Sequence, residues 1–159
     1  LGRGQQLDKT GPEDARNGGI RIKADGTDHP QFVVLDANYR WLYNSQNTAC
    51  GGAAVMGAEH MERCFLQGLG TDSYKTNYGV YVGVPTNRAI TLRYAAKGKD
   101  APAPNYGQRV YLTDGNGYTI FRPLGGELEF TADISKVPAG MNAAIYFVSM
   151  DRLGGLNSV

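Results

Sequence analysis

The stretch VVLDANYRWLY, residues 33–43, predicts a β-strand that carries an aromatic face. Its rings, Tyr39, Trp41 and Tyr43, fall at every second position, and successive side chains of a strand point to opposite faces. The three rings should therefore share one face. Two interpretations of that face are open, because strand aromatics usually pack into a core, whereas an exposed row of rings offers flat apolar surfaces to a ligand.

The rest of the chain also predicts strands, with little helix. The Asp-Gly step in DGNG, residues 114–117, indicates a tight hairpin turn between two of them. One short helix is expected at 58–68, where Gly68 ends it. Closely spaced short strands of this kind are typical of an antiparallel sandwich. Outside 33–43, strands are predicted at 20–23, 78–84, 89–96, 108–113, 118–124, 126–135 and 142–151.

Two of the later predicted strands have clear patterns. In GELEFTADIS, residues 126–135, apolar side chains alternate with Glu127, Glu129 and Asp133, so one face should be apolar and the other acidic. The last stretch, NAAIYFVSMD at 142–151, is mostly apolar, which predicts a central strand covered on both faces.

Length and charge limit the classes of function. The 159 residues suit one domain, 1–159, and the formal net charge is only +1, from 16 basic and 15 acidic residues. No Lys/Arg cluster is interleaved with aromatic residues, so a nucleic acid or an anionic membrane is not expected as a partner. The longest apolar runs are a few residues, which excludes a membrane-spanning segment, and no signal-peptide pattern begins the sequence.

Cys50 and Cys64 are the two cysteines of the chain. A disulfide between them would close a loop rich in Gly and Ala and stabilise the fold by roughly 3 kcal/mol. Two buried free thiols are the alternative. Zinc is not indicated, because no group of histidines lies near the pair.

Three stretches carry a resemblance to a known family: VVLDANYRW (33–41), YGV (78–80) and LGGELEFTADISKVPAGMNAAIYFVSMD (124–151). There the sequence resembles the N-terminal portion of glycoside hydrolase family 7, the cellobiohydrolases and endoglucanases that act on cellulose. The resemblance implies an all-β, concanavalin-like jelly-roll sandwich of antiparallel sheets, of which this chain would hold about half. In the family, the concave face carries a groove or tunnel for a β-1,4-glucan chain.

The resemblance also implies a set of substrate-binding residues. Tyr39 and Trp41 match glucan-stacking platforms, while Tyr43 matches no family position with a role. A flat ring buries the apolar C–H face of a glucose unit, and hydrogen bonds engage its polar rim. Simpler roles stay open, since Arg109 also suits a strand surface and Asn142 a turn. The full set of matched binding residues is Asn38, Tyr39, Trp41, Tyr78, Asn105, Arg109, Asn142 and Tyr146.

The same resemblance implies no catalytic residue in this chain. Family 7 enzymes are retaining hydrolases whose two carboxylates come from a Glu-x-Asp-x-x-Glu motif, which does not occur in these 159 residues. Glu127 and Glu129 lie on a stretch that is not catalytic in the family, so we interpret them as a solvated face. No cofactor and no metal are implied.

The family is rich in disulfides, and this chain retains some of its cysteines. The Cys50–Cys64 bridge is retained on the family pattern. Phe65 and Ala139 replace two other family cysteines whose partners are also absent.

Two hypotheses of function follow. The first is a secreted, glucan-binding N-terminal portion of a cellulase-like hydrolase, completed by a C-terminal segment or second chain that carries the acids. The second is a non-catalytic structural or carbohydrate-binding protein that assembles through exposed strand edges, including self-association. In both, half a jelly-roll should leave unpaired strand edges and an open apolar layer.

Overall fold

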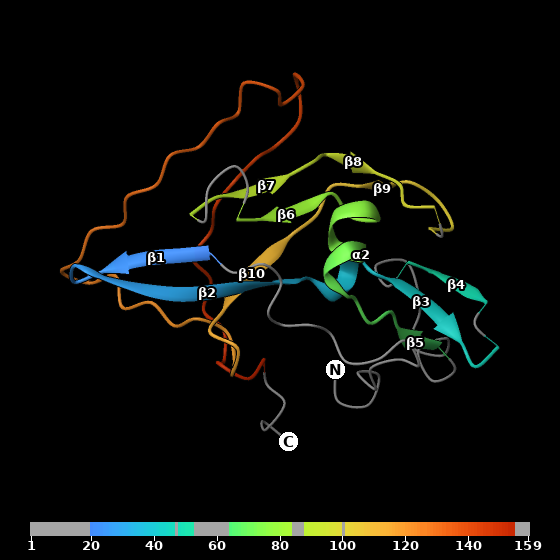
Figure 1. Ribbon diagram of the computed structural model, residues 1–159, viewed down its shortest axis with the longest axis horizontal. Helices are drawn as coiled ribbons and strands as arrows, with labels where there is room; N and C mark the ends of the chain where they lie inside the picture. Colours follow the sequence, from blue (N-terminus) through green and yellow to red (C-terminus); the bar gives the residue numbers. More distant parts are fainter. Residues whose placement is uncertain (1–19, 47, 53–63, 84–87, 100, 155–159) are drawn as a thin grey trace.

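The structure, a computed structural model, describes residues 20–46, 48–52, 64–83, 88–99 and 101–154 (Figure 1). Its strands are β1 (Ile20–Ala24), β2 (Thr27–Leu35), β3 (Trp41–Asn44), β4 (Ala49–Gly52), β5 (Cys64–Leu66), β6 (Val80–Val82), β7 (Ile90–Leu92), β8 (Ala95–Ala96), β9 (Asn105–Tyr106) and β10 (Val110–Thr113). A 3-10 helix covers Ala37–Tyr39, and an α-helix, α2, covers Thr71–Thr76.

The predicted all-β class is confirmed for the described residues. Every strand pair is antiparallel, and the sheets have the orders β1-β2-β10, β4-β3-β5, β6-β7 and β8-β9. The short α2 is the one α-helix in the described ranges. In that part of the chain, no helix is long and apolar enough to cross a membrane.

The sheet β1-β2-β10 joins distant parts of the chain. Asp25 and Gly26, with positive φ angles of 50° and 79°, turn the chain tightly between β1 and β2. Two positive φ angles characterise a type I′ hairpin turn, for which Asp-Gly is a preferred pair. The second half of β2 then pairs with β10, with Leu35 opposite Val110. This pairing brings the residues that follow β2 beside those that precede β10.

The main hydrophobic core contains side chains from β2, α2 and β6. Tyr39 and Trp41 pack against it and stay partly exposed. Leu42, the neighbour of Trp41 on β3, instead packs with Cys64 in a second, smaller cluster. Neighbouring residues of a strand point to opposite faces, which explains why β3 separates the two clusters. The buried residues of the main core are Val33, Leu35, Leu69, Tyr74, Tyr78, Val80 and Val82.

The single strand predicted over 33–43 is wrong. The chain leaves β2 at Asp36, makes a 3-10 turn and begins β3 only at Trp41. The break forms at Asp36 because its carboxylate accepts a hydrogen bond of 2.8 Å from the backbone N–H of Asn38, and this local bond competes with continued strand pairing. Tyr39 therefore does not lie on the same strand as Trp41.

The helix predicted at 58–68 is wrong where the structure describes it, and residues 58–63 lie outside the described ranges. Cys64–Leu66 forms β5, whose backbone pairs with β3. The α-helix lies instead at Thr71–Thr76, where Tyr74 faces the core. Six residues make fewer than two helical turns, too few to show a helical repeat in the sequence.

The strands predicted between 78 and 113 are confirmed, although each is shorter than expected. The stretches 78–84 and 89–96 supply β6 and β7, which pair with each other, and β8. The stretch 108–113 supplies β10. The predicted turn at 114–117 is also confirmed, since the N–H of Asp114 donates to the carbonyl of Gly117 at 3.2 Å.

The three strands predicted at 118–124, 126–135 and 142–151 are wrong. One bridge, Thr113 with Tyr118, continues the hairpin, and from there to 150 the described chain contains no strand. Figure 1 shows this stretch as a wide arc that leaves the body of the protein. A strand is held by hydrogen bonds to a neighbour, and beyond Thr119, whose N–H donates to the carbonyl of Leu112, no described segment pairs with this arc.

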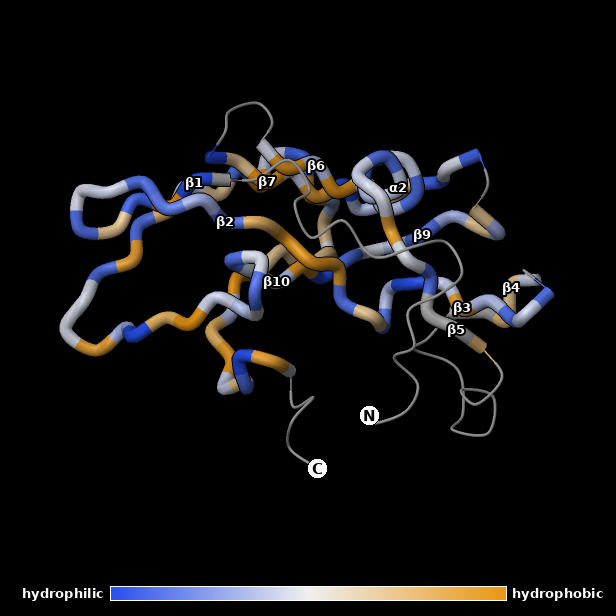
Figure 2. Tube along the Cα trace, turned by 60° about the horizontal axis from the view of Figure 1, so that its bottom comes forward, coloured by the Kyte–Doolittle hydropathy of each residue, from blue (hydrophilic) through white to orange (hydrophobic). Residues whose placement is uncertain are grey.

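The arc retains the hydropathy pattern of strands. Figure 2 shows hydrophobic and hydrophilic residues alternating along it. Residues 121–149 are all exposed, so the expectation that 142–151 is covered on both faces is wrong as well. Leu124, for example, is 97% exposed. We refer to residues 120–149 as the exposed arc.

Candidate functional site

Asp36 forms the centre of a polar cluster at the point where β2 ends. Its Oδ1 accepts from the backbone N–H of Asn38, and its Oδ2 accepts from Arg109 Nε at 2.7 Å and from the Tyr111 hydroxyl at 3.0 Å. Arg109 Nη2 also lies 2.6 Å from Oδ2, and the backbone N–H of Asp36 donates to the carbonyl of Arg109. The β2–β10 pairing thus places one buried carboxylate against a cation and a phenol.

The charges of this cluster stabilise one another. Burial opposes ionisation of Asp36, but hydrogen bonds from Asn38, Arg109 and Tyr111 outweigh it and lower the pKa of the carboxyl. The hydrogen bond to Asp36 raises the pKa of Arg109. Burial, followed by the bond to Asp36, raises the pKa of Tyr111. Asp36 and Arg109 are therefore a fixed ion pair at neutral pH.

Aromatic rings flank the guanidinium of Arg109. Its Cζ lies 5.9 Å from the centroids of both the Tyr39 and the Tyr111 rings. Tyr111 in turn meets Tyr118 edge-on, with centroids 5.5 Å apart and planes at 71°. We call these residues, Tyr39, Arg109, Tyr111 and Tyr118, the tyrosine row. All four side chains are partly or largely accessible.

Trp41 is the first residue of β3, which follows the 3-10 turn of this site, and its backbone contacts Tyr78. The backbone N–H of Trp41 donates to the Tyr78 hydroxyl at 3.3 Å, and that hydroxyl donates to Gln67 Oε1 at 2.5 Å. Tyr78 is 1% exposed, and this burial raises its pKa to about 12. Its ring lies in the core, and its hydroxyl group holds the backbone of Trp41 through the hydrogen bond. Trp41 Nε1 is buried and has no hydrogen-bond partner among the described residues.

The structure brings together some of the predicted binding residues. Asn38, Tyr39 and Arg109 meet at Asp36. Asn105, on β9, donates from Nδ2 to the carbonyl of Asn77 at 2.8 Å and so braces the residue before Tyr78.

Asn142 and Tyr146 lie apart from this cluster, on the exposed arc. Asn142 Nδ2 donates to the Tyr146 hydroxyl at 3.3 Å, and both side chains are exposed. The neighbouring Phe147 ring meets Phe121 edge-on at 5.6 Å. These contacts lie within the arc itself.

Sequence reasoning missed Asp36 and Tyr111. The signal for Asp36 is present in the sequence, because Asp-x-Asn favours a local turn at the Asp side chain, even inside a stretch that otherwise predicts a strand. Tyr111 lies two positions after Arg109 in the strand predicted at 108–113, so the two are expected to point to the same face. Their shared bond to Asp36 depends on the β2–β10 register, which local sequence does not reveal.

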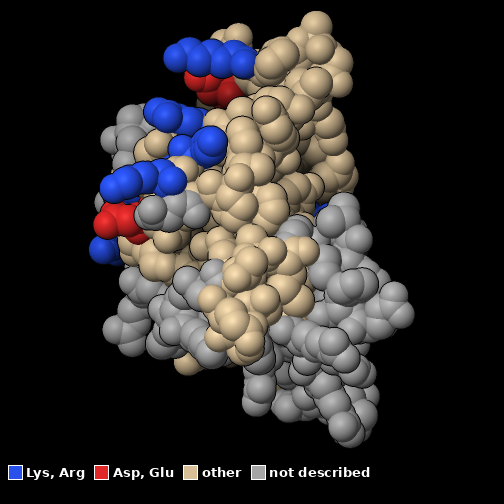
Figure 3. All heavy atoms as spheres, turned by 90° about the vertical axis from the view of Figure 1, so that its right-hand side faces the viewer, with Lys and Arg blue, Asp and Glu red and all other residues tan. Residues whose placement is uncertain are grey.

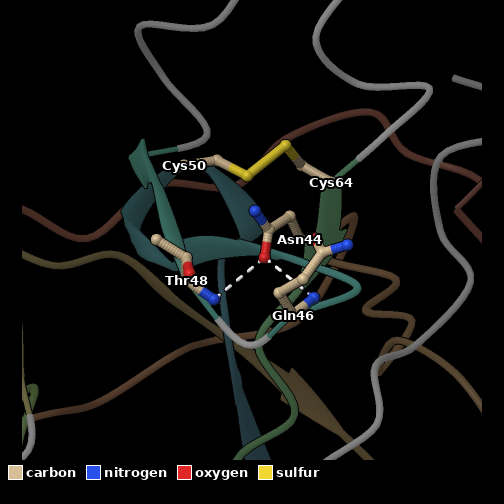
Figure 4. Close-up of a disulfide and its surroundings, with 5 residues drawn as sticks. All are labelled: Asn44, Gln46, Thr48, Cys50 and Cys64. Atoms are coloured by element: carbon tan, nitrogen blue, oxygen red, sulfur yellow. Dashed lines mark hydrogen bonds between the residues drawn. A yellow bond between two sulfur atoms is a disulfide. The ribbon is translucent and has the colours of Figure 1, made fainter.

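The predicted disulfide between Cys50 and Cys64 is confirmed. It joins β4 to β5, the two strands that flank β3 (Figure 4). Below it, Asn44 Oδ1 accepts from the backbone N–H groups of Gln46 and Thr48 at 3.0 and 2.9 Å and shapes the turn into β4. The strand that carries Trp41 is therefore held on both sides.

Charged side chains are unevenly distributed over the described residues. Within the described ranges, no group of three or more His, Cys, Asp or Glu side chains lies together. On the face that Figure 3 shows, most described side chains are uncharged, and Lys and Arg gather toward one edge. The cluster at Asp36 offers tyrosine rings, hydroxyls and one guanidinium, which suit a neutral ligand with hydroxyl groups.

Comparison with known proteins identifies relatives for nearly the whole chain. Residues 21–159 match the model of "Glycosyl hydrolase family 7". The exoglucanase GH7B of Limnoria quadripunctata is 31% identical over an alignment of 144 residues, and this alignment covers 82% of this chain and 30% of that protein. The chain therefore spans 30% of the length of this relative, a smaller share than the half that its sequence suggests.

One solved structure supports the fold, and a second has a lower TM-score. A GH7 family cellobiohydrolase from Daphnia pulex superposes with a TM-score of 0.51 and 22% identity, over 68% of this chain and 26% of that chain. A cellobiohydrolase from Melanocarpus albomyces, solved in complex with cellotetraose, gives a TM-score of 0.47 and 25% identity over 67% of this chain and 25% of that one.

The family follows from the extent of the sequence match. The family model covers almost every residue after the first twenty, and the Daphnia pulex superposition independently supports the β-sandwich jelly-roll fold. The chain belongs to glycosyl hydrolase family 7.

Proposed function

We propose that this chain forms the N-terminal part of the glucan-binding surface of a cellulase-like retaining glycoside hydrolase. The observation that carries the proposal is the tyrosine row, held against Asp36 at the junction of β2 and β10. In this function the ligand is a β-1,4-glucan. Tyr39 and Trp41 supply stacking surfaces, and Arg109, with Asn38 beside it, supplies hydrogen bonds to the sugar hydroxyls.

A glucan suits this surface in both shape and charge. A glucose ring has apolar faces and a rim of hydroxyls, so it needs flat rings beside hydrogen-bond donors rather than a counter-charge. Tyr39 and Tyr111 provide such rings, each with its centroid 5.9 Å from the Cζ of Arg109. Tyr78 and Asn105 act in the layer below, because their polar atoms bind Gln67, Trp41 and the carbonyl of Asn77.

Catalysis in this proposal belongs to another segment of the polypeptide or to a second chain. Retaining hydrolysis needs two carboxylates about 5–5.5 Å apart. Asp36 is engaged with Arg109 and Tyr111, and Glu127 and Glu129 lie on the exposed arc. The family's Glu-x-Asp-x-x-Glu motif is not in the sequence.

The exposed arc supports completion by further strands. Its apolar side chains alternate with acidic ones as on a half-buried strand, yet they lie open to solvent. Large exposed apolar patches on a protein normally mark interaction surfaces. We propose that Asn142 and Tyr146 join the glucan site only when neighbouring strands hold the arc in place.

A non-catalytic binding or structural role is the second candidate, and the same arc favours it. Unpaired strand edges also pair readily with copies of the same chain. Sedimentation analysis of the purified chain, together with a mass measurement of every polypeptide present, separates the two. Turnover of a soluble cello-oligosaccharide by a companion chain that carries the missing motif supports the hydrolase. A stable self-associated form without turnover or companion supports the second role.

Secretion fits the proposal through the disulfide. Disulfides persist in oxidising compartments and are rare in the cytosol. The Cys50–Cys64 bridge closes the described β4–β3–β5 sheet, so the folded chain is suited to an extracellular environment.

The binding site is tested by titrating the chain with cellotetraose in a calorimeter. Tyr39→Ala and Trp41→Ala should each weaken binding, because one stacked aromatic ring is worth about 1–3 kcal/mol, or roughly 5–150-fold. Tyr94→Ala is the matched control, since Tyr94 is an exposed tyrosine that contacts Tyr106 and lies outside the tyrosine row.

Thermal melts must accompany these titrations, because both rings also pack against the core. A folded Tyr39→Ala chain that binds as well as Tyr94→Ala would contradict the proposed site.

A further inference from the structure

We propose that Asp36 is the positioning residue of this site: it fixes the guanidinium of Arg109 between the rings of Tyr39 and Tyr111 and thereby determines how well Arg109 can bind a sugar hydroxyl. The inference rests on the proposed glucan-binding function. It concerns a side chain that makes no contact with the ligand itself, because Asp36 is only 9% exposed and Arg109 covers it from the solvent side at 49% exposure.

The geometry leaves part of Arg109 available. Nε and Nη2 both approach the same oxygen, Oδ2 of Asp36, at 2.7 and 2.6 Å. Within the described ranges, Nη1 has no hydrogen-bond partner on the protein. An arginine held by one edge presents its remaining N–H groups in a fixed direction, whereas an unanchored arginine samples many rotamers.

The carboxylate also fixes the two rings that flank the guanidinium. Oδ1 accepts from the N–H of Asn38 and so shapes the 3-10 turn that carries Tyr39. Oδ2 accepts from the Tyr111 hydroxyl and orients the second ring. One side chain therefore sets the positions of both rings and of the cation between them.

Only an ionised carboxylate can make all these bonds. Both oxygens of Asp36 act purely as acceptors, and every group that faces them is a donor. In asparagine, one of the two positions becomes an NH₂ group, which would meet either the N–H of Asn38 or the donors of Arg109 and Tyr111. A protonated Asp36 has the same defect, because one oxygen then carries a hydrogen.

We expect the charge of Asp36 to control the pH dependence of this site, and the groups that face it are the following. Tyr111 on β10 and Arg109, the residue directly before β10, face the carboxyl, and Tyr39 lies on the adjoining 3-10 turn. Arg40, after that turn, donates to the carbonyl of Leu35, the residue before Asp36. From α2, the Tyr74 hydroxyl accepts from the N–H of Leu35. The pKa of Arg109 is raised by its hydrogen bond to Asp36 and that of Tyr111 by burial, so neither of these two side chains changes charge in mildly acidic solution.

A change in binding at acidic pH therefore reports on the charge of Asp36. Its pKa is lowered in the folded chain, so the ion pair persists through mildly acidic pH and is lost only when the pH falls below the ordinary range of an aspartate. Binding should follow the same course.

The test compares Asp36→Asn and Asp36→Glu with Asp28→Asn across this pH range. Asp28 is a matched control, because it forms an Asp–Arg pair of the same 2.6 Å length on β2, with the exposed Arg88. Two readouts are used: the affinity for cellotetraose, and the NMR signal of the Arg109 Nε–H, which reports on Arg109 without any ligand.

In the wild type, affinity and the Arg109 signal should fall together on acidification. Asp36→Asn should bind about tenfold more weakly at neutral pH, the loss expected for a charged hydrogen bond, and its affinity should no longer change with pH over that window. Asp36→Glu should recover part of the affinity, and Asp28→Asn should behave as the wild type.

The inference is overturned if folded Asp36→Asn keeps the wild-type affinity and pH profile, or if its Arg109 signal is unchanged. Should Asp36→Asn fail to fold, the acid titration of the wild type decides, and an affinity that falls while the Arg109 signal stays sharp overturns the inference. A wild type that binds no cellotetraose, yet loses the Arg109 signal on acidification, overturns the proposed function and still supports the positioning of Arg109 by Asp36.

Discussion

Replacing both cysteines with alanine, in a Cys50→Ala/Cys64→Ala variant, should lower the free energy of unfolding by about 3 kcal/mol. The estimate comes from the bridge itself: a cross-link between residues 14 apart removes roughly this much conformational freedom from the unfolded chain. The loss of native packing adds little, because Cys64 packs in a small cluster with Leu42. Nearly the whole effect should therefore arise in the unfolded state.

Urea denaturation followed by tryptophan fluorescence measures this change, since Trp41 is the one tryptophan of the chain and lies on the strand between the bridged strands. The dependence of unfolding free energy on urea should steepen, because an uncross-linked chain exposes more surface. The wild type treated with a reductant is the matched control and should coincide with the double variant.

A loss below about 1 kcal/mol, against the roughly 3 kcal/mol that the cross-link model gives, would refute this reasoning. It would mean that the segment between the two cysteines stays compact after unfolding. A variant that cannot fold at all would also refute it, because the bridge would then be required for the native packing of β3.

Three further outcomes are expected. Tyr78→Phe should cost about 1–3 kcal/mol in thermal or urea unfolding, because it removes the hydroxyl between the N–H of Trp41 and Gln67 Oε1. Since the pKa of Tyr78 is raised from 10.0 to about 12, its contribution to stability is fully present below pH 10 and is lost as the pH rises through about 12; alkaline unfolding of the wild type, but not of Tyr78→Phe, should show this loss. Trypsin should cut the exposed arc after Lys136 before other sites, as mass spectrometry of short digests would show, and protection of that bond would mean that a partner covers the arc. Gly79→Ala should destabilise the fold, because Gly79 has a positive φ of 67° and an added Cβ would lie 2.9 Å from the Cβ of Arg93; a melting temperature equal to that of the wild type would contradict the turn geometry.

The sequence predicts those parts of the fold that depend on local chemistry. The strands between 78 and 113 follow from alternation and from turns such as that at 114–117, where the residue types set the backbone. The disulfide follows from the family resemblance. These features need only neighbouring residues, or a pattern shared with relatives, to be identified.

Pairing between distant segments is what the sequence does not reveal. The alternation in 126–135 correctly shows which side chains would share a face, but a strand forms only when a second segment supplies its hydrogen bonds. The helix predicted at 58–68 fails for a related reason, since Cys64–Leu66 pairs with β3 and the disulfide fixes it there. In 126–135 a partner strand is missing among the described residues, whereas at Cys64–Leu66 pairing with β3 overrides the local helix propensity.

In the candidate site, too, the sequence predicts the local features but not the contacts between distant segments. The aromatic residues between 33 and 43 are recognisable in the sequence, and so is Arg109. Their arrangement is not, because Asp36 breaks the predicted strand and moves Tyr39 onto a turn. The residue that organises the site is therefore a short side chain between the more conspicuous rings.

The pairing of β2 with β10 also determines when this sheet can form during synthesis of the chain. Asp36 and Arg109 are separated by 73 positions, so at ribosomal speeds of 5–20 residues per second roughly 4–15 s pass between the synthesis of one and the arrival of the other. During that interval the edge of β2 that later pairs with β10 has no hydrogen-bond partner, and a chaperone or a neighbouring nascent chain can bind to it. Maturation of this protein should therefore be sensitive to translation rate over the codons that separate the two strands.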